Sequence, residues 1–202
     1  FYLGLLILWL LMLIVGYLIL KKRLPHLLRR IASPMAIAFN TASSEAVYPK
    51  MVEEMERFGC KDKIVSFVLP LGYSFNLDGS MMYMTFASMF IAQAYNVTSV
   101  TGDIGTQITM LLVFMLTSKG IAGVPRASLV VVLATCGMFN IPAEGIGLIL
   151  AIDVFCDMGR TMTNVLGNAL ATVAVSKWEG ELVHHSHHHK DHTHDHQHSH
   201  HS

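Results

Sequence analysis

The chain has 202 residues, of which 52% are apolar and 14% are charged, and its mean hydropathy is +0.48. This composition is too hydrophobic for an ordinary soluble domain and predicts a membrane protein. Basic and acidic residues balance at 14 each, and no basic patch with interleaved aromatic residues occurs, so the sequence gives no sign of nucleic-acid binding. Cys60, Cys136 and Cys156 are too widely spaced to support a disulfide framework.

Residues 1–20 form an apolar run with single glycine interruptions, which predicts a transmembrane helix across a bilayer core of about 30 Å. A basic cluster follows, and positive charge of this kind is typical of the cytoplasmic side. It consists of Lys21, Lys22, Arg23, Arg29 and Arg30. Because these charges follow the apolar run instead of preceding it, a signal peptide is the weaker interpretation. The chain begins inside this run at Phe1, so we expect it to be part of a longer protein.

Residues 31–59 predict a re-entrant helical hairpin. The segment is apolar up to Phe39, small and polar at Thr41-Ala-Ser-Ser44, and amphipathic beyond Pro49. Its apolar part is too short to cross a bilayer, and irregular backbone at membrane depth requires burial in protein or a water-filled cavity. The alternative is a cytoplasmic loop in which Ser43 or Ser44 caps a helix.

Residues 64–97 are long enough to span a bilayer, but they are interrupted at Gly72 and again at Asn76-Leu-Asp-Gly-Ser80. These residues lower helix propensity, so the segment predicts a broken transmembrane helix. Unwound carbonyls and the Asp78 carboxylate are hard oxygen ligands, which suit a small cation such as Na⁺.

Residues 106–140 repeat the hairpin pattern around the sequence Thr117-Ser-Lys-Gly-Ile-Ala-Gly-Val-Pro125, and residues 141–178 form a further long apolar helix. The chain therefore predicts an all-α membrane protein. It would consist of inverted repeats, each a re-entrant hairpin followed by a transmembrane helix, with the site where the two hairpin tips meet.

A polar face marks the last apolar helix. Its six polar members are offset by 4, 7, 8, 11 and 15 positions, so at about 100° per residue they share roughly a third of the helix circumference. They are Asp153, Asp157, Arg160, Thr161, Asn164 and Asn168. Polar groups buried in hydrocarbon need partners or a ligand, so this face predicts a functional site. The alternative, a soluble amphipathic helix, is disfavoured by the flanking apolar runs 146–152 and 169–175.

Residues 184–202 contain eleven histidines and no apolar residue, which predicts a disordered tail. The segment from His184 to His201 could chelate Zn²⁺ or Ni²⁺, and we exclude it from the folded domain at 1–183.

Four motifs in this order resemble the dicarboxylate/amino acid:cation symporter family, to which the glutamate transporters belong. They are T-A-S-S-E at 41–45, G-Y-S-F-N-L-D-G-S at 72–80, S-K-G-I-A-G-V-P at 118–125 and D-M-G-R-T-M-T-N-V-L-G-N at 157–168. The resemblance covers the C-terminal half of the family sequence. It implies a transport domain that moves in an elevator-like manner against a trimeric scaffold, whose helices lie outside this chain.

The resemblance also implies roles for individual residues. Arg160 corresponds to the arginine that binds the side-chain carboxylate of glutamate or aspartate, and Asp157 to the aspartate that receives the substrate amino group. The other implied substrate-binding residues are Thr161, Asn164, Ser43, Ser44, Gly123 and Val124. The implied cation-binding residues are Gly72, Ser74, Asn76, Asp78, Ser118, Lys119, Ile121, Asp153 and Asn168.

The sequence departs from the family pattern at three places. Asn168 replaces an aspartate that ligates sodium in sodium-coupled members, and an amide here resembles the proton-coupled bacterial carriers. Arg126 follows Pro125 where a glycine is usual, which puts the flexibility of the second tip in question. Ala42 and Met158 occupy the positions at which many members carry a second arginine.

Together these features predict symport of an acidic amino acid, glutamate or aspartate, coupled to Na⁺ and/or H⁺. We expect no cofactor, and a homotrimer in the inner membrane with a cytoplasmic C-terminal tail. A C4-dicarboxylate symporter is the alternative within the family. A non-transporting, metal-binding membrane protein or a degenerate half-carrier is the alternative of another class. An enzyme is not expected, because the Ser43 and Ser44 hydroxyls have no histidine base in the apolar part, where His26 is the only imidazole.

Overall fold

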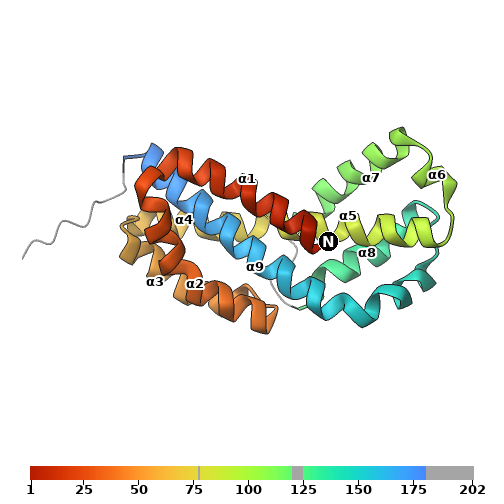
Figure 1. Cartoon of the computed structure of the whole chain (residues 1–202), viewed down its shortest axis with the longest axis horizontal. Coiled ribbons are helices and arrows are strands. Elements are labelled where there is room, and N and C mark those ends of the chain that lie inside the picture. Colours follow the sequence, from red (N-terminus) through yellow and green to blue (C-terminus); the bar gives the residue numbers. More distant parts are fainter. Residues whose placement is uncertain (77, 120–124, 181–202) are drawn as a thin grey trace, which may run out of the picture.

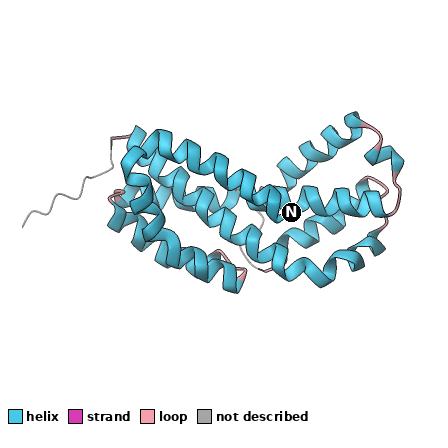
Figure 2. Ribbon diagram, viewed as in Figure 1, coloured by secondary structure: helices cyan, strands magenta, loops and turns pink. Residues whose placement is uncertain are grey.

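The computed structural model describes residues 1–76, 78–119 and 125–180, and every regular element in these ranges is a helix. Figure 2 shows helices joined by loops throughout this part of the chain. The expected all-α class is therefore confirmed for the described residues. The roles expected of Ile121, Gly123, Val124 and the histidine-rich tail lie outside them.

Helix α1, Tyr2–Leu20, is the predicted apolar span. It ends at Lys21, whose φ of 52° leaves the helical region, and a 3₁₀ turn at Lys21–Arg23 leads directly into α2, Leu24–Thr41. Only Leu5, Gly16 and Leu20 of α1 are buried, so most of its apolar surface faces outward. An outward apolar surface of this extent suits contact with lipid or with another apolar element.

The first hairpin consists of α2 and α3, Tyr48–Phe58. Ala42 ends α2 in the left-handed conformation, and a 3₁₀ turn at Glu45–Val47 reverses the chain. Apolar residues at helical spacing on the facing sides, such as Ile31 on α2 and Met55 on α3, are fully buried and hold the pair together.

The segment predicted to be a broken helix consists of α4, Asp62–Phe75, and α5, Asp78–Ala94. A short helix, α6, Thr98–Thr101, then leads to the second hairpin. That hairpin consists of α7, Ile104–Thr117, and α8, Ala127–Met138. The Asp103 side chain caps α7 by accepting a hydrogen bond from the Gly105 N–H at 3.0 Å.

Helix α9, Ile146–Trp178, follows a 3₁₀ turn at Ala143–Gly145 and is the element against which most of the others pack. Figure 1 shows the α2–α3 and α7–α8 hairpins at opposite ends of the molecule, with α9 running between them. One apolar cluster joins α2, α3 and α4 to the C-terminal half of α9, and a second joins α5, α7 and α8 to its N-terminal half. The polar face of α9 lies between these two cores.

Within the described residues, the run Tyr2–Thr41 contains the one helix that is long and apolar enough to cross a membrane by length and composition. Helices α4 and α5 are shorter, and the polar face of α9 lowers its hydropathy. Entry of the two hairpins from opposite sides of a membrane, and with it the inverted repeat, stays a prediction.

Candidate substrate and cation site

The polar face of α9 is almost completely withdrawn from solvent. All six predicted side chains are buried, and the largest exposed fraction among them is 3%, at Asp157. Buried polar groups are stable only when they are paired. The partner of each side chain is therefore informative, since a buried polar group without a protein partner is available to a ligand.

Asp157 and Arg160 form a buried ion pair, in which Arg160 Nε lies 2.5 Å from Asp157 Oδ1. The second oxygen of Asp157 accepts the backbone N–H of Arg126 at 2.8 Å. Thr161 donates to the Asp157 carbonyl at 2.8 Å, which keeps its hydroxyl on α9. Removing one member of a buried pair typically costs about 3–5 kcal/mol, because the other charge is left uncompensated.

Asn164 and Ser80 join α9 to the start of α5. The side-chain oxygen of Asn164 accepts the backbone N–H groups of Gly79 at 2.8 Å and of Ser80 at 3.3 Å, which have no partner within the first turn of α5. Its Nδ2 donates to Ser80 Oγ at 3.0 Å, and Arg160 Nη1 donates to the same hydroxyl at 3.3 Å. Ser80 thus belongs to the site although it was not among the predicted residues.

Gly79 allows this approach. A β-carbon at this position would lie 2.4 Å from the carbonyl oxygen of Arg160, which is backbone and cannot rotate away. Gly79, the second glycine of the motif at 72–80, therefore has a packing role, because the first turn of α5 lies directly on the backbone of α9.

Oxygen-bearing side chains gather where α4 ends and α5 begins. A β-carbon on Gly72 would lie 2.6 Å from Asn168 Oδ1, and one on Gly167 would lie 3.2 Å from Asp78 Oδ2 and 3.4 Å from Asn76 Nδ2. Asn168 Oδ1 is buried and has no hydrogen-bond partner among the described residues. The Asp78 carboxylate and the unpaired amide oxygen of Asn168 are hard oxygen donors of the kind that a small cation such as Na⁺ takes.

Several predicted residues have other contacts. Ser118 donates to the Met115 carbonyl at 3.1 Å, and Lys119 Nζ donates to the Phe75 carbonyl at 2.9 Å, at the end of α4. Ser44 is buried, and its carbonyl accepts the Tyr73 hydroxyl at 3.0 Å, which ties the first hairpin to α4.

Ser43 Oγ accepts the Ala46 N–H at 3.3 Å, within the turn between α2 and α3. None of the hydrogen bonds found among the described residues involves the Ser74 side chain, and none joins Ser44 to α9. The substrate roles of the two tip serines therefore stay predictions.

Asp153 lies one turn before Asp157 and has two partners that the sequence did not indicate. Its Oδ1 accepts a hydrogen bond from the Tyr83 hydroxyl, and its Oδ2 lies 3.2 Å from Arg126 Nε. Arg126 precedes α8 with a φ of 63°, in the left-handed region. Glycine adopts this conformation without strain, in keeping with the glycine that the resemblance implies at this position.

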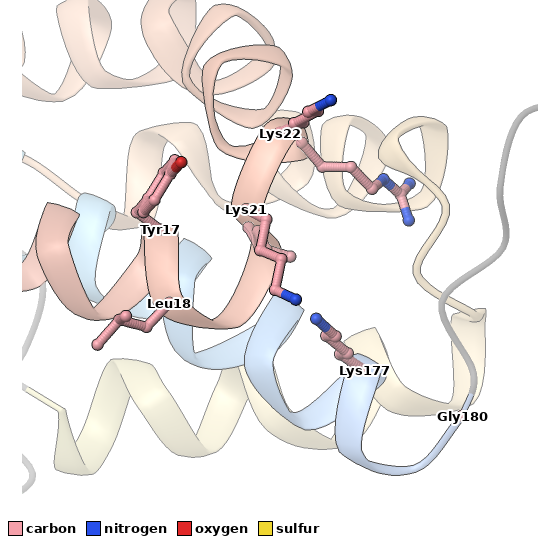
Figure 3. A pocket seen from close by; sticks show the side chains of 8 residues that line it. Tyr17, Leu18, Lys21, Lys22, Lys177 and Gly180 are labelled. Carbon is pink, nitrogen blue, oxygen red and sulfur yellow. The ribbon is translucent and has the colours of Figure 1, made fainter.

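A separate basic pocket of about 610 Å³ lies where α1 and α9 end. Figure 3 shows the Lys21 and Lys177 side chains pointing toward each other across it. Its lining residues are Tyr17, Leu18, Leu20, Lys21, Lys22, Arg23, Lys177 and Gly180. None of them belongs to the polar face of α9, so this pocket is distinct from the candidate site.

Comparison with known proteins identifies the family. Residues 1–178 match the family model of the sodium:dicarboxylate symporter family, and the chain belongs to this family of membrane transporters. The predicted resemblance is thereby confirmed, and so is the expectation that the protein is not an enzyme.

The matching relatives carry related names. The chain is 53% identical over 156 residues to a proton/sodium-glutamate symport protein of Geobacillus stearothermophilus, which covers 77% of the chain and 36% of the relative. It is 49% identical over 153 residues to a proton/glutamate-aspartate symporter of Escherichia coli, and this match covers 76% of the chain and 34% of the relative. It is 48% identical over 157 residues to a C4-dicarboxylate transport protein of Azorhizobium caulinodans, and this match covers 77% of the chain and 34% of the relative. The matched part is thus about a third of each relative's length.

Proposed function

We propose that this chain supplies the substrate and cation site of a symporter for an acidic amino acid, glutamate or aspartate, driven by Na⁺ and/or H⁺. The observation that carries the proposal is the buried Asp157–Arg160 pair, one turn from the Ser80–Asn164 pair. An acidic amino acid carries one ammonium and two carboxylates. A carboxylate and a guanidinium side by side can pair with the ammonium and with the distal carboxylate.

The individual roles follow from this chemistry. Arg160 binds the distal carboxylate, because its planar guanidinium can donate two parallel hydrogen bonds. Asp157 receives the amino group, with Thr161 beside it, and Asn164 holds the remaining carboxylate from α9. The group formed by Gly72, Asn76, Asp78 and Asn168 takes the coupling cation, for which its oxygen donors are suited.

The assembly belongs to the same proposal. The chain moves as the transport domain of a homotrimer in the inner membrane, against a scaffold of the kind that the family resemblance implies. The basic residues after α1 support a cytoplasmic location for that end of α1, and the proposal puts the C-terminal tail on the same side.

The test is uptake of labelled aspartate and glutamate by the complete carrier in proteoliposomes with imposed Na⁺ or H⁺ gradients. Arg160→Ala removes the only guanidinium that bonds both Asp157 and Ser80 among the described residues. We expect uptake to fall at least about 100-fold, as for loss of a buried charged partner. Arg160→Lys should recover part of it, and Arg29→Ala on the exposed face of α2 is the matched control. Glutamate uptake of unchanged apparent affinity in Arg160→Ala would show that the assignment is wrong.

A C4-dicarboxylate is the second candidate substrate, and one observation favours it. Both oxygens of Asp157 already accept hydrogen bonds from protein groups, namely Arg160 Nε and the Arg126 N–H, so the carboxylate is satisfied without a ligand amine. If this is the native preference, succinate should inhibit uptake of labelled aspartate as strongly as unlabelled aspartate does. Inhibition about tenfold weaker, a difference of roughly 1.4 kcal/mol, would favour the amino acid.

A further inference from the structure

Arg126 is a cation at the edge of the site for which the proposed function has no role. It lies immediately before α8, and its Nε is 3.2 Å from Asp153 Oδ2. The Arg126 side chain is 54% exposed, whereas that of Asp153 is 1% exposed. The guanidinium thus reaches from an accessible position to a carboxylate that is closed off from solvent.

The same residue also contacts the second carboxylate of the polar face. Its backbone N–H donates to Asp157 Oδ2 at 2.8 Å, while Arg160 Nε holds the other oxygen at 2.5 Å. Two carboxylates and two guanidinium groups therefore compensate one another, and the sum of their formal charges is zero. This part of the binding face is neutral by means of protein groups alone.

The surroundings of Asp153 make this compensation necessary. Tyr83 on α5 donates its hydroxyl to the carboxylate, and Phe1 and Cys156 line the same apolar pocket of about 150 Å³. Within the described part of the chain, Arg126 is the side-chain cation paired with Asp153. A carboxylate left unpaired in such a place is strongly unfavourable.

We propose that the Arg126 guanidinium is a built-in counterion for the Asp153 carboxylate. It takes the place of a bound cation when the carrier crosses the membrane without substrate and coupling ions. The inference rests on the proposed symport function. Net uptake requires the unloaded binding face to return across the membrane, and an unpaired buried charge would oppose that step. Exchange of external for internal substrate requires only loaded crossings, in which ligand and coupling ions are present.

The experiment compares net uptake with exchange in proteoliposomes containing the complete carrier. Arg126→Gln keeps the length and polarity of the side chain and removes its charge. We expect net aspartate uptake to fall at least about tenfold, because one partner of a buried pair is lost. Exchange against internal unlabelled aspartate should stay within about threefold of the original rate, because the loaded step does not depend on the pair. Arg126→Lys should retain net uptake, and Arg29→Gln is the matched surface control.

A double-mutant cycle tests the charge pairing directly. Asp153→Asn alone should also impair net uptake, since it leaves Arg126 without its partner. Combined with Arg126→Gln it should lower net uptake no further than the more impaired single variant, because the pair is already broken in either single variant.

Three results separate the outcomes. A parallel loss of net uptake and exchange in Arg126→Gln, or no loss of either, would overturn the inference. The inference would also be overturned if the double variant lost net uptake by the product of the losses in the two single variants. If the unmodified carrier shows neither uptake nor exchange, the proposed function itself fails.

Discussion

Asn168 shows how a single residue can adjust the cation site. Its Oδ1 is buried and unpaired among the described residues, and it lies against Gly72. As an amide it provides an oxygen without a formal charge, so it attracts a cation less strongly than a carboxylate would.

Asn168→Asp should therefore strengthen the sodium dependence of uptake. We expect the sodium concentration for half-maximal uptake to fall about tenfold, which corresponds to roughly 1.4 kcal/mol of added attraction. Uptake by proteoliposomes at fixed pH across a sodium series measures this shift. Asn140→Asp, at an exposed position in the loop after α8, is the matched control and should have no effect. An unchanged sodium series in Asn168→Asp would place the coupling cation elsewhere.

The sequence predicted the polar face of α9, and the structure buries all six of its side chains. The spacing of polar residues on α9 indicated a shared face, because helical periodicity is fixed by backbone geometry. Tyr83 and Ser80 were not predicted, since each meets α9 at a distance of 70 or more positions along the chain. Such contacts depend on how α5 is positioned along α9, and the sequence of either helix alone does not determine that position.

At the scale of elements, the site depends on the close contact between α5 and α9. The N–H groups of Gly79 and Ser80, at the start of α5, are satisfied by the Asn164 side chain on α9. A helix end whose donors are satisfied by a neighbouring helix is fixed to that helix, so the binding residues on both helices keep their relative positions.

Gly79→Ala tests this contact. Its added β-carbon would lie 2.4 Å from the Arg160 carbonyl, so α5 must move away from α9. We expect substrate binding to be lost and the thermal midpoint in detergent to fall, by an amount equivalent to about 1–3 kcal/mol of overpacking. Gly137→Ala on α8 is the control, because nothing lies within 4 Å of its added β-carbon. It should be neutral or slightly stabilising, since alanine favours a helix. Equal behaviour of the two variants would contradict the proposed role of the contact.

The predicted break in residues 64–97 lies between Phe75 and Asp78, where α4 ends and α5 begins. Low helix propensity at Asn76 and Gly79 made this break predictable. Helix α6 was not predicted, because its four residues are too few to show a periodicity.

For the whole molecule, α9 is the element shared by both apolar cores. It packs with the first hairpin through its C-terminal half and with the second through its N-terminal half. A displacement of either hairpin therefore acts on the same helix that bears the polar face. This arrangement suits a domain that moves as one body, as the elevator-like proposal requires.

The histidine-rich tail, residues 184–202, should be dispensable for transport. None of the site residues identified on α9 lies beyond Asn168, so deleting residues 184–202 should leave aspartate uptake by the complete carrier unchanged. The same deletion should abolish zinc binding measured by calorimetry, because imidazoles are the zinc ligands concentrated there. Tight zinc binding by a protein that binds no aspartate would instead support the non-transporting alternative.

The left-handed backbone at Arg126 carries a consequence for stability. A non-glycine residue at a φ of 63° is less favourable than glycine by about 1–2 kcal/mol. Arg126→Gly removes this cost, but it also leaves the buried Asp153 carboxylate without its counterion, at about 3–5 kcal/mol, so the thermal midpoint of the single variant should fall. Arg126→Gly combined with Asp153→Asn removes the cost of the left-handed backbone without leaving a buried charge, so the double variant should be more heat-resistant than the single one.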